Sequence, residues 1–252
     1  MQRPSPSQVR TFERQILSWF AQHGRTFPWR QRSASTYVCV VSEVLLQRTR
    51  AEVVAGFLPA FSRSYPSWKK LAQASEAELE RWLKPLGLWR RRAVSLLALA
   101  RAIDARGGRL PRVREDIESL PGVGQYIANA ICLFTLGNAE PLLDVNMARV
   151  LERCFGRRRL ADIRYDPLLQ EVARLIVAVE EPARINWAIL DLAATVCRQG
   201  EPRCTVCPLV GVCVVGRKRS SVVRPGKPGL FSAASMKVRA VRIARPVSPK
   251  WL

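Results

Sequence analysis

No run of apolar residues in this 252-residue sequence is long enough to cross a lipid bilayer, because Arg, Glu or Asp interrupts every one of them. The N-terminal stretch MQRPSPSQVRTFER has no hydrophobic core of the kind that marks a secretory signal peptide. These two absences argue against a membrane protein and against an exported protein. We therefore expect the protein to work in the cytoplasm.

Acidic residues are also scarce. Asp and Glu total 20 whereas Lys and Arg total 41, which gives a formal net charge of +21. A basic surface gains free energy on DNA because it releases condensed counterions, so this imbalance favours a nucleic acid as the partner. The alternative is a solubilising surface in an arginine-prone genome. The rest of the composition, with 48% hydrophobic and 24% charged residues, is that of an ordinary globular protein.

Convincing pairs of β-strands are missing as well, and apolar residues recur at nearly helical spacing along most of the chain. The fold class that we expect is therefore all-α. The pattern predicts helices over residues 9–23, 37–47, 51–62, 76–83, 90–105, 114–119, 125–136, 144–154, 167–179 and 182–198.

The helical pattern divides into two subdomains. Residues 30–135 are expected to form one helical bundle, which contains a helix, a hairpin and a second helix over about 114–136. The N-terminal segment 1–29 is expected to pack with residues 136–213. The segment 214–252 holds ten Lys and Arg and no acidic residue, so we expect a flexible basic tail that contacts phosphates.

Seven cysteines raise the possibility of disulfides, but four of them crowd together in a chain without a signal peptide, which favours a metal or cluster site. The four are Cys197, Cys204, Cys207 and Cys213. Thiolates at this spacing can hold a tetrahedral zinc ion or a cubane iron–sulfur cluster, and the spacing alone leaves both open, with disulfides third. The other three, Cys39, Cys132 and Cys154, lie in apolar helical patterns and are expected to be buried thiols.

The stretch LPGVGQY places two glycines, Gly122 and Gly124, immediately before a predicted helix. Glycines permit close approach and unusual backbone angles, and the amides at a helix N-terminus attract an anion such as a DNA phosphate. We expect these glycines, together with Val123 and Gln125, to contact DNA. The alternative is a tight turn between two helices.

Two carboxylates stand out. Asp144 precedes a predicted helix, so it is either the N-cap of that helix or a carboxylate that serves chemistry. Glu43 lies in the apolar stretch VVSEVLL, where burial of a glutamate is costly unless it has a purpose. Burial would raise its pKa and suit it to proton donation. The alternative is a salt bridge to one of the many arginines.

Together these motifs resemble the helix-hairpin-helix (HhH-GPD) DNA glycosylases that carry an iron–sulfur loop. The resemblance covers most of residues 7–213. It is carried by the cysteine spacing of endonuclease III and MutY-like enzymes, by LPGVG with LLDVN after the next helix, and by SEVLLQRT, which is similar to SEVMLQQT of the adenine glycosylases. It implies a C-terminal [4Fe–4S] cluster loop at 197–213. It also implies a monomer that binds double-stranded DNA with a mismatch or lesion, in a bacterial or archaeal cytoplasm near the nucleoid.

The resemblance also implies roles for single residues. The match of Asp144 supports cleavage of the N-glycosidic bond, because a fixed negative charge stabilises the oxocarbenium-like sugar. Tyr126 stands where members that also cut the strand carry a Schiff-base lysine, so it implies a glycosylase without lyase activity. This tyrosine is expected to wall the pocket and stack on a flipped base. The match of Glu43 protonates adenine in adenine glycosylases and contacts the flipped base in thymine-mismatch glycosylases.

Two further stretches resemble the DNA-contacting parts of the family. Gln47 and Arg48 match the pair that fills the hole left in the duplex by the extruded base. The turn FPWR is similar to the turn that lines the base pocket, so Phe27, Trp29 and Arg30 are expected there. The alternative for this turn is core packing around a loop.

Two substrates fit the resemblance: thymine or uracil opposite guanine, and adenine opposite guanine or 8-oxoguanine. Only 39 residues follow Cys213, too few for the NUDIX-like domain of adenine glycosylases. The stretch GLWRR lacks the tyrosines that those enzymes carry, and Arg48 replaces their second glutamine. These features favour the pyrimidine substrate, although SEVLLQ and LLDVN fit either branch. A non-catalytic DNA-binding protein and an AP lyase or nuclease are the less favoured interpretations.

Overall fold

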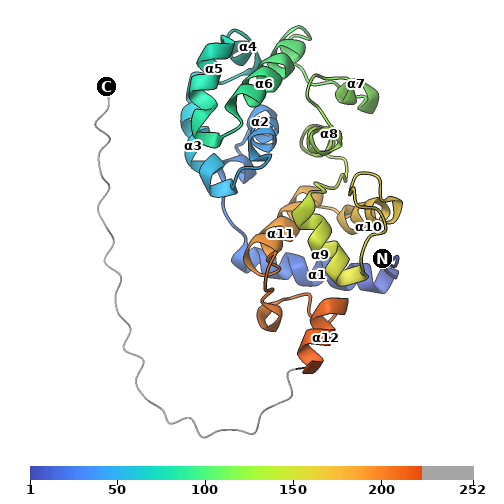
Figure 1. Ribbon diagram of the computed structural model, residues 1–252. Coiled ribbons are helices and arrows are strands. Elements are labelled where there is room, and N and C mark those ends of the chain that lie inside the picture. Colours follow the sequence, from blue (N-terminus) through green and yellow to red (C-terminus); the bar gives the residue numbers. More distant parts are fainter. Residues whose placement is uncertain (223–252) are drawn as a thin grey trace, which may run out of the picture. The chain divides into compact units, whose positions relative to one another are not determined.

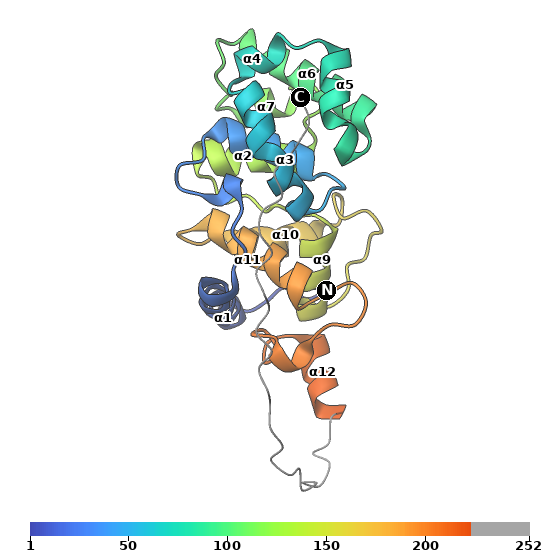
Figure 2. The ribbon, with the colours of Figure 1, turned by 90° about the vertical axis from the view of Figure 1, so that its left-hand side faces the viewer.

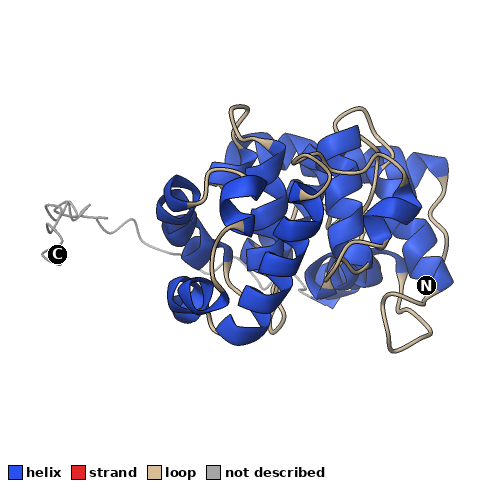
Figure 3. Cartoon of the chain, turned by 90° about the horizontal axis from the view of Figure 1, so that it is seen from above, coloured by secondary structure: helices blue, strands red, loops and turns tan. Residues whose placement is uncertain are grey.

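The computed structural model describes residues 1–222, and the regular elements in that range are all helical (Figure 3), which confirms the all-α fold class. None of these helices is long and apolar enough to span a bilayer. The α-helices are α1 (Pro6–His23), α2 (Thr36–Leu46), α3 (Ala51–Ser64), α4 (Trp68–Ala72), α5 (Glu76–Leu83), α6 (Trp89–Asp104), α7 (Arg114–Glu118), α8 (Gln125–Ile131), α9 (Val145–Phe155), α10 (Pro167–Val177), α11 (Pro182–Thr195) and α12 (Val214–Val222). Shorter helical turns are η1 (Pro28–Arg30), η2 (Lys84–Leu86), η3 (Cys132–Leu136) and η4 (Cys204–Val206).

Short polar side chains begin several of the helices. Ser5 caps α1 in a reciprocal arrangement with Gln8, in which each side chain accepts from the other residue's backbone N–H. Ser35 caps α2 and Ser75 caps α5 in the simpler way, by accepting one backbone N–H of the first turn. Proline stands in the first turn of α1, α10 and α11, where its missing N–H costs no hydrogen bond.

The helices form two groups, each around its own hydrophobic core. The core of the first group is built by residues from Phe27 to Cys132, which lie on α2 to α8 and on the turns before, between and after these helices. The core of the second group combines α1 with α9, α10 and α11, so the N-terminal helix packs beside helices that follow it by more than a hundred residues. Figures 1 and 2 show the two groups one above the other, with α1 beside α11 in both views. The chain therefore crosses between the groups after α1 and again before α9.

The structure departs from the helix predictions in three places. The short helix α4 was not predicted, and the predicted helix 125–136 ends as the wide π turn η3. The expectation of a flexible tail from residue 214 is wrong for its first part, because Val214–Val222 forms α12. Cys213 anchors this helix, since its carbonyl accepts from Arg217 N at 2.9 Å and its sulfur from Gly216 N at 3.3 Å. The remainder of the predicted tail, 223–252, lies outside the described residues.

Candidate active site

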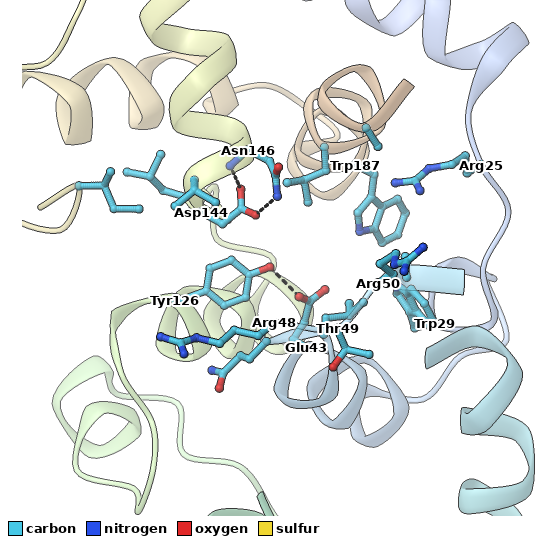
Figure 4. A pocket seen from close by; sticks show the side chains of 18 of the residues that line it. Arg25, Trp29, Glu43, Arg48, Thr49, Arg50, Tyr126, Asp144, Asn146 and Trp187 are labelled. Carbon is cyan, nitrogen blue, oxygen red and sulfur yellow. Dashed lines mark hydrogen bonds between the residues drawn. The ribbon is translucent and has the colours of Figure 1, made fainter. Parts of the chain in front are cut away.

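Helix α2 carries Glu43 into the interior of the first helical group. Apolar neighbours bury the helix on most of its faces, and the Glu43 side chain is left 2% exposed. Tyr126, the second residue of α8, donates its phenolic hydrogen to Glu43 Oε2 at 2.8 Å (Figure 4). Two residues that are 83 positions apart in the sequence are thereby joined at the wall of one cavity.

Burial sets the protonation of this pair. It raises the pKa of Glu43 from 4.5 to about 7, while the hydrogen bond from Tyr126 and the positive charge of Arg30 oppose the rise. The pKa of Tyr126 is raised well above 10 by its burial and by the negative charges of Glu43 and Asp144. At neutral pH the phenol therefore keeps its proton, and the carboxyl exists in both its acid and its ionised form.

Asp144 lies at the N-cap of α9, across the cavity from this pair (Figure 4). Its Oδ1 accepts from Asn146 N at 2.9 Å and from Met147 N at 2.8 Å, and its Oδ2 accepts from Asn146 Nδ2 at 2.5 Å. Burial raises the pKa of Asp144, and these hydrogen bonds counteract the rise. The capping role that the sequence offered as an alternative is thus observed, and the same carboxylate also lines the cavity.

Arg149 supports Asp144 from behind. Its Nη2 donates to Asn146 Oδ1 at 3.1 Å and to the carbonyl of Ala193 at 3.1 Å, and its Nε donates to the carbonyl of Cys197 at 2.9 Å. A chain of hydrogen bonds therefore runs along α9 from the carboxylate to the first cysteine of the cysteine-rich loop.

The FPWR turn, which includes η1, forms another part of the wall. The rings of Phe27 and Trp29 stack with their centroids 4.7 Å apart, and the guanidinium of Arg30 lies 4.9 Å from the Phe27 centroid. Trp29 and Arg30 line the cavity. Phe27 does not, and lies behind them in the core of the first group. Core packing, the alternative for this turn, thus describes Phe27.

The sequence analysis missed two residues of α11, of which Trp187 lines the cavity and Asp191 holds two arginines that line it. Asp191 is fully buried and accepts from the guanidinium groups of Arg30, at 2.9 and 3.1 Å, and of Arg25, at 2.8 Å. Trp187 lines the cavity, and its Nε1–H, like the Nε–H of Arg30, is buried without a hydrogen-bond partner in the described part of the chain. A usable signal existed for Asp191, an acidic residue within the apolar stretch AILDLAA. The sequence carried none for Trp187.

The cavity itself has a volume of about 920 Å³ and receives side chains from both helical groups. Of the predicted site residues it brings together Trp29, Arg30, Glu43, Gln47, Arg48, Gln125, Tyr126 and Asp144. The hairpin residues Gly122, Val123 and Gly124 do not line it. They form the turn that leads into α8, where Gly122 adopts a φ of +73° and where a Cβ at this position would lie 3.4 Å from the Ser95 side chain of α6.

The four crowded cysteines lie in and beside the loop between α11 and α12, and all are free thiols. Arg153 Nη1 donates to Cys197 Sγ at 3.3 Å, as the Gly216 amide does to Cys213. A hydrogen bond from the buried Cys154 thiol helps to lower the pKa of Cys213 to about 6. Within residues 1–222 no group of three or more His, Cys, Asp or Glu side chains stands in an arrangement that could hold a metal ion.

Replacing Glu43 with Gln is expected to make the free energy of unfolding less dependent on pH. The folded-state pKa of about 7 lies above the ordinary 4.5, so the native protein keeps a proton that the unfolded chain releases between these pH values. Stability of the wild type should therefore fall as pH rises through this window, by roughly 3 kcal/mol in total. Urea unfolding of both proteins between about pH 5 and pH 8 measures the difference. A gap that stays constant across this range would contradict the burial of an ionisable group here.

Comparison with known proteins gives consistent matches. Residues 41–176 match the HhH-GPD superfamily of base excision DNA repair proteins. The chain is 38% identical over 211 residues to a thymine-DNA glycosylase of Aeropyrum pernix, a match that spans 82% of this chain and 94% of that protein. It is 31% identical to an adenine DNA glycosylase of Rattus norvegicus, over 96% of this chain and 49% of that protein. The solved structure of a thermostable thymine-DNA glycosylase superposes with a TM-score of 0.75 at 30% identity, and the match covers 84% of this chain and 98% of that one.

Proposed function

Because the chain belongs to the HhH-GPD superfamily of base excision DNA repair proteins, we propose that it is a DNA glycosylase that removes thymine or uracil opposite guanine and leaves the strand intact. The observation that carries the proposal is the cavity in which Glu43, Tyr126 and Asp144 meet from three different helices. A volume of about 920 Å³ suffices for a flipped nucleotide.

In this proposal Asp144 and Glu43 act on opposite ends of the bond that breaks. The bond between C1′ and the base nitrogen cleaves and its electron pair leaves with the base, so positive charge develops on the sugar. The Asp144 carboxylate stabilises that charge, and water then adds to C1′ and releases a proton to solvent, from which Glu43 regains the proton that it gives to the base. The acid form of Glu43 donates a hydrogen bond or a proton to the departing base. A pKa of about 7 keeps this form populated at neutral pH.

Tyr126 positions Glu43 and takes no part as a nucleophile. Its raised pKa keeps the phenol protonated, and a phenol forms no Schiff base with a sugar. The product is therefore an abasic site in an uncut strand. Strand nicking without added alkali would favour the AP lyase alternative instead.

Features of the sequence favour a pyrimidine as the base. The stretch GLWRR lacks the tyrosines that adenine glycosylases carry, and Arg48 stands where those enzymes have a second glutamine. The similarity to a thymine-DNA glycosylase over most of both chains agrees with this assignment. Adenine opposite guanine or 8-oxoguanine is the second candidate, favoured by the similarity to an adenine DNA glycosylase.

Single-turnover excision from duplexes with G·T, G·U, A·G and A·8-oxoguanine pairs tests the function. We expect release of thymine or uracil, with little release of adenine. Adenine release without pyrimidine release would replace the first candidate with the second. No release from any duplex, together with intact DNA binding, would leave a non-catalytic DNA-binding protein.

The duplex itself is proposed to lie across the hairpin and the α2–α3 turn. Gly122 to Gln125 would hold a phosphate at the start of α8, which fixes register without reading sequence. Gln47 and Arg48, both exposed at the cavity rim, would fill the space that the flipped base leaves. The net charge of +21 favours such a complex, and one copy of the chain is expected to suffice.

We also propose that the four loop cysteines hold a [4Fe–4S] cluster that shapes this part of the molecule. All four are free thiols, which are the donors that such a cluster takes, and the Cys154 thiol and the Gly216 amide help to lower the pKa of Cys213, which favours the thiolate form that ligates iron. The cluster supplies a structural crosslink to the loop when it is bound.

Purified protein is expected to contain about four iron atoms per chain. Cys204→Ser should lose most of this iron, because it removes one of the four ligands. Cys132→Ser removes a buried thiol of the first helical group, outside the loop, and should retain the iron. Iron analysis with the visible absorbance spectrum measures both. One zinc ion per chain without iron would contradict the assignment.

A further inference from the structure

Two exposed turns, the first of which lines the cavity, hold non-glycine residues in the left-handed backbone region. Arg48, in the turn between α2 and α3, has a φ of 58°, and Leu88, between η2 and α6, has a φ of 52°. No other non-glycine residue of the described range 1–222 has a positive φ. This conformation is unfavourable for a residue that carries a Cβ, so surrounding contacts must impose it.

Arg92, in the first turns of α6, makes those contacts. Its side chain reaches the α2–α3 turn, where Nη1 donates to the carbonyl of Leu45 at 2.8 Å and Nη2 donates to the carbonyl of Gln47 and, at 2.7 Å, to Thr49 Oγ1. Its backbone N–H makes the first hydrogen bond of α6, to the carbonyl of Leu88 at 3.0 Å. The side chain of Arg92 therefore joins α6 to the α2–α3 turn and holds the backbone on both sides of Arg48.

The guanidinium of Arg92 is buried and has no ionic partner among residues 1–222. The residue is 7% exposed, its acceptors are two carbonyls and a hydroxyl, and burial lowers its pKa. Burial of a cation on neutral acceptors is costly, although the negative end of the α2 dipole offsets part of the cost. The planar fork of arginine donates to several acceptors at once, which the ammonium of lysine cannot match.

The position of Arg92 indicates a role in supporting the α2–α3 turn and not a role in bond cleavage. It does not line the cavity, and its hydrogen bonds hold the backbone on both sides of Arg48. The Gln47 and Arg48 side chains that project from this turn are exposed at the cavity rim. A rigid turn can enter a duplex without first losing conformational freedom.

We propose that Arg92 is a positioning residue for base extrusion, which holds the Gln47–Arg48 turn in the conformation that occupies the duplex in place of the flipped base. The inference rests on the proposed glycosylase function. Loss of the guanidinium slows extrusion of the target base from the duplex. It leaves the rate of N-glycosidic bond cleavage in an already extruded nucleotide unchanged.

The test compares one target base in two duplexes, using the mispair that the wild type processes fastest. In the first duplex the base is mispaired, and in the second it stands opposite an abasic site, where it is already weakly held. Arg92→Met is expected to lower single-turnover excision about 10- to 100-fold from the mispair, and to leave excision from the second duplex within about threefold of wild type. The excision rate of Arg92→Lys on the mispair should lie between those of the wild type and Arg92→Met. Arg101→Met, on the same helix, removes an exposed arginine with one weak contact and should match wild type.

Each outcome bears on the inference. Equal losses on both duplexes would overturn it, because they would indicate damage to the catalytic groups. Unchanged excision from the mispair would overturn it as well. If Arg92→Met does not fold, Arg92→Lys and Thr49→Val carry the same comparison, since Thr49→Val removes one acceptor of the guanidinium. An inactive wild type would refute the proposed function instead, which keeps the two failures distinct.

Discussion

Asp144→Asn is expected to lower single-turnover excision by roughly 10³-fold or more, with DNA affinity and thermal stability close to wild type. The substitution removes the negative charge that stabilises the oxocarbenium-like sugar. It preserves the helix cap, because Asn is as good an N-cap as Asp and its side-chain oxygen can still accept from the backbone amides of Asn146 and Met147, and only the hydrogen bond from Asn146 Nδ2 is lost. Excision kinetics, DNA binding and thermal melting of the two proteins measure the three quantities.

Asp166→Asn is the matched control. Asp166 is the N-cap of α10, buried and bonded to three backbone amides, but it does not line the cavity. The same change there should leave the excision rate of the folded protein unchanged and affect stability alone. Asp144→Asn with a wild-type excision rate would reduce Asp144 to a cap.

Glu43→Gln is expected to lower excision by about 10²- to 10³-fold, because Gln offers no carboxylic acid proton to the departing base. The amide oxygen can still accept the hydrogen bond of Tyr126, so the local structure should persist. The wild-type rate should decline as pH rises through about 7, where the acid form of Glu43 is lost. The residual rate of the variant should show no such decline. Single-turnover rates across this pH range measure both profiles.

Glu52→Gln controls for the loss of a carboxylate at the same cavity. Glu52 also lines the cavity, but it is exposed and forms an ion pair with Arg25 at 2.8 Å, so we expect no role for it in proton donation. It should keep the wild-type rate and the wild-type pH profile. A wild-type profile that is flat across neutral pH would remove Glu43 as the acid.

Local patterns in the sequence predicted much of the fold and site. Apolar periodicity placed most helices within a few residues, and the position of Asp144 before a periodic segment indicated its cap. A glutamate in a run of valine and leucine was enough to mark Glu43 as buried.

Contacts between distant segments were not predictable in this way. The pairing of Asp191 with Arg30 joins positions 161 residues apart, and the hold of Arg92 on the Gln47 carbonyl spans 45. Apolar periodicity indicates which face of a helix is buried, but it does not indicate which other segment packs against that face. The same limit hid the change to α12, because a short basic helix is stabilised here by its contacts with α9 and the cysteine loop and not by its own pattern.

The pairing of α1 with α11 has a consequence for biosynthesis. The core of the first helical group uses residues between Phe27 and Cys132, so it can assemble on the ribosome while the rest of the chain is still being made. Helix α1 leaves the ribosome well before α11, yet its buried residues Phe12 and Ile16 pack in a core that needs α11. Its apolar face therefore stays without its partner until about 170 further residues have been translated. During that interval the nascent chain exposes the surface on which a ribosome-associated chaperone would act.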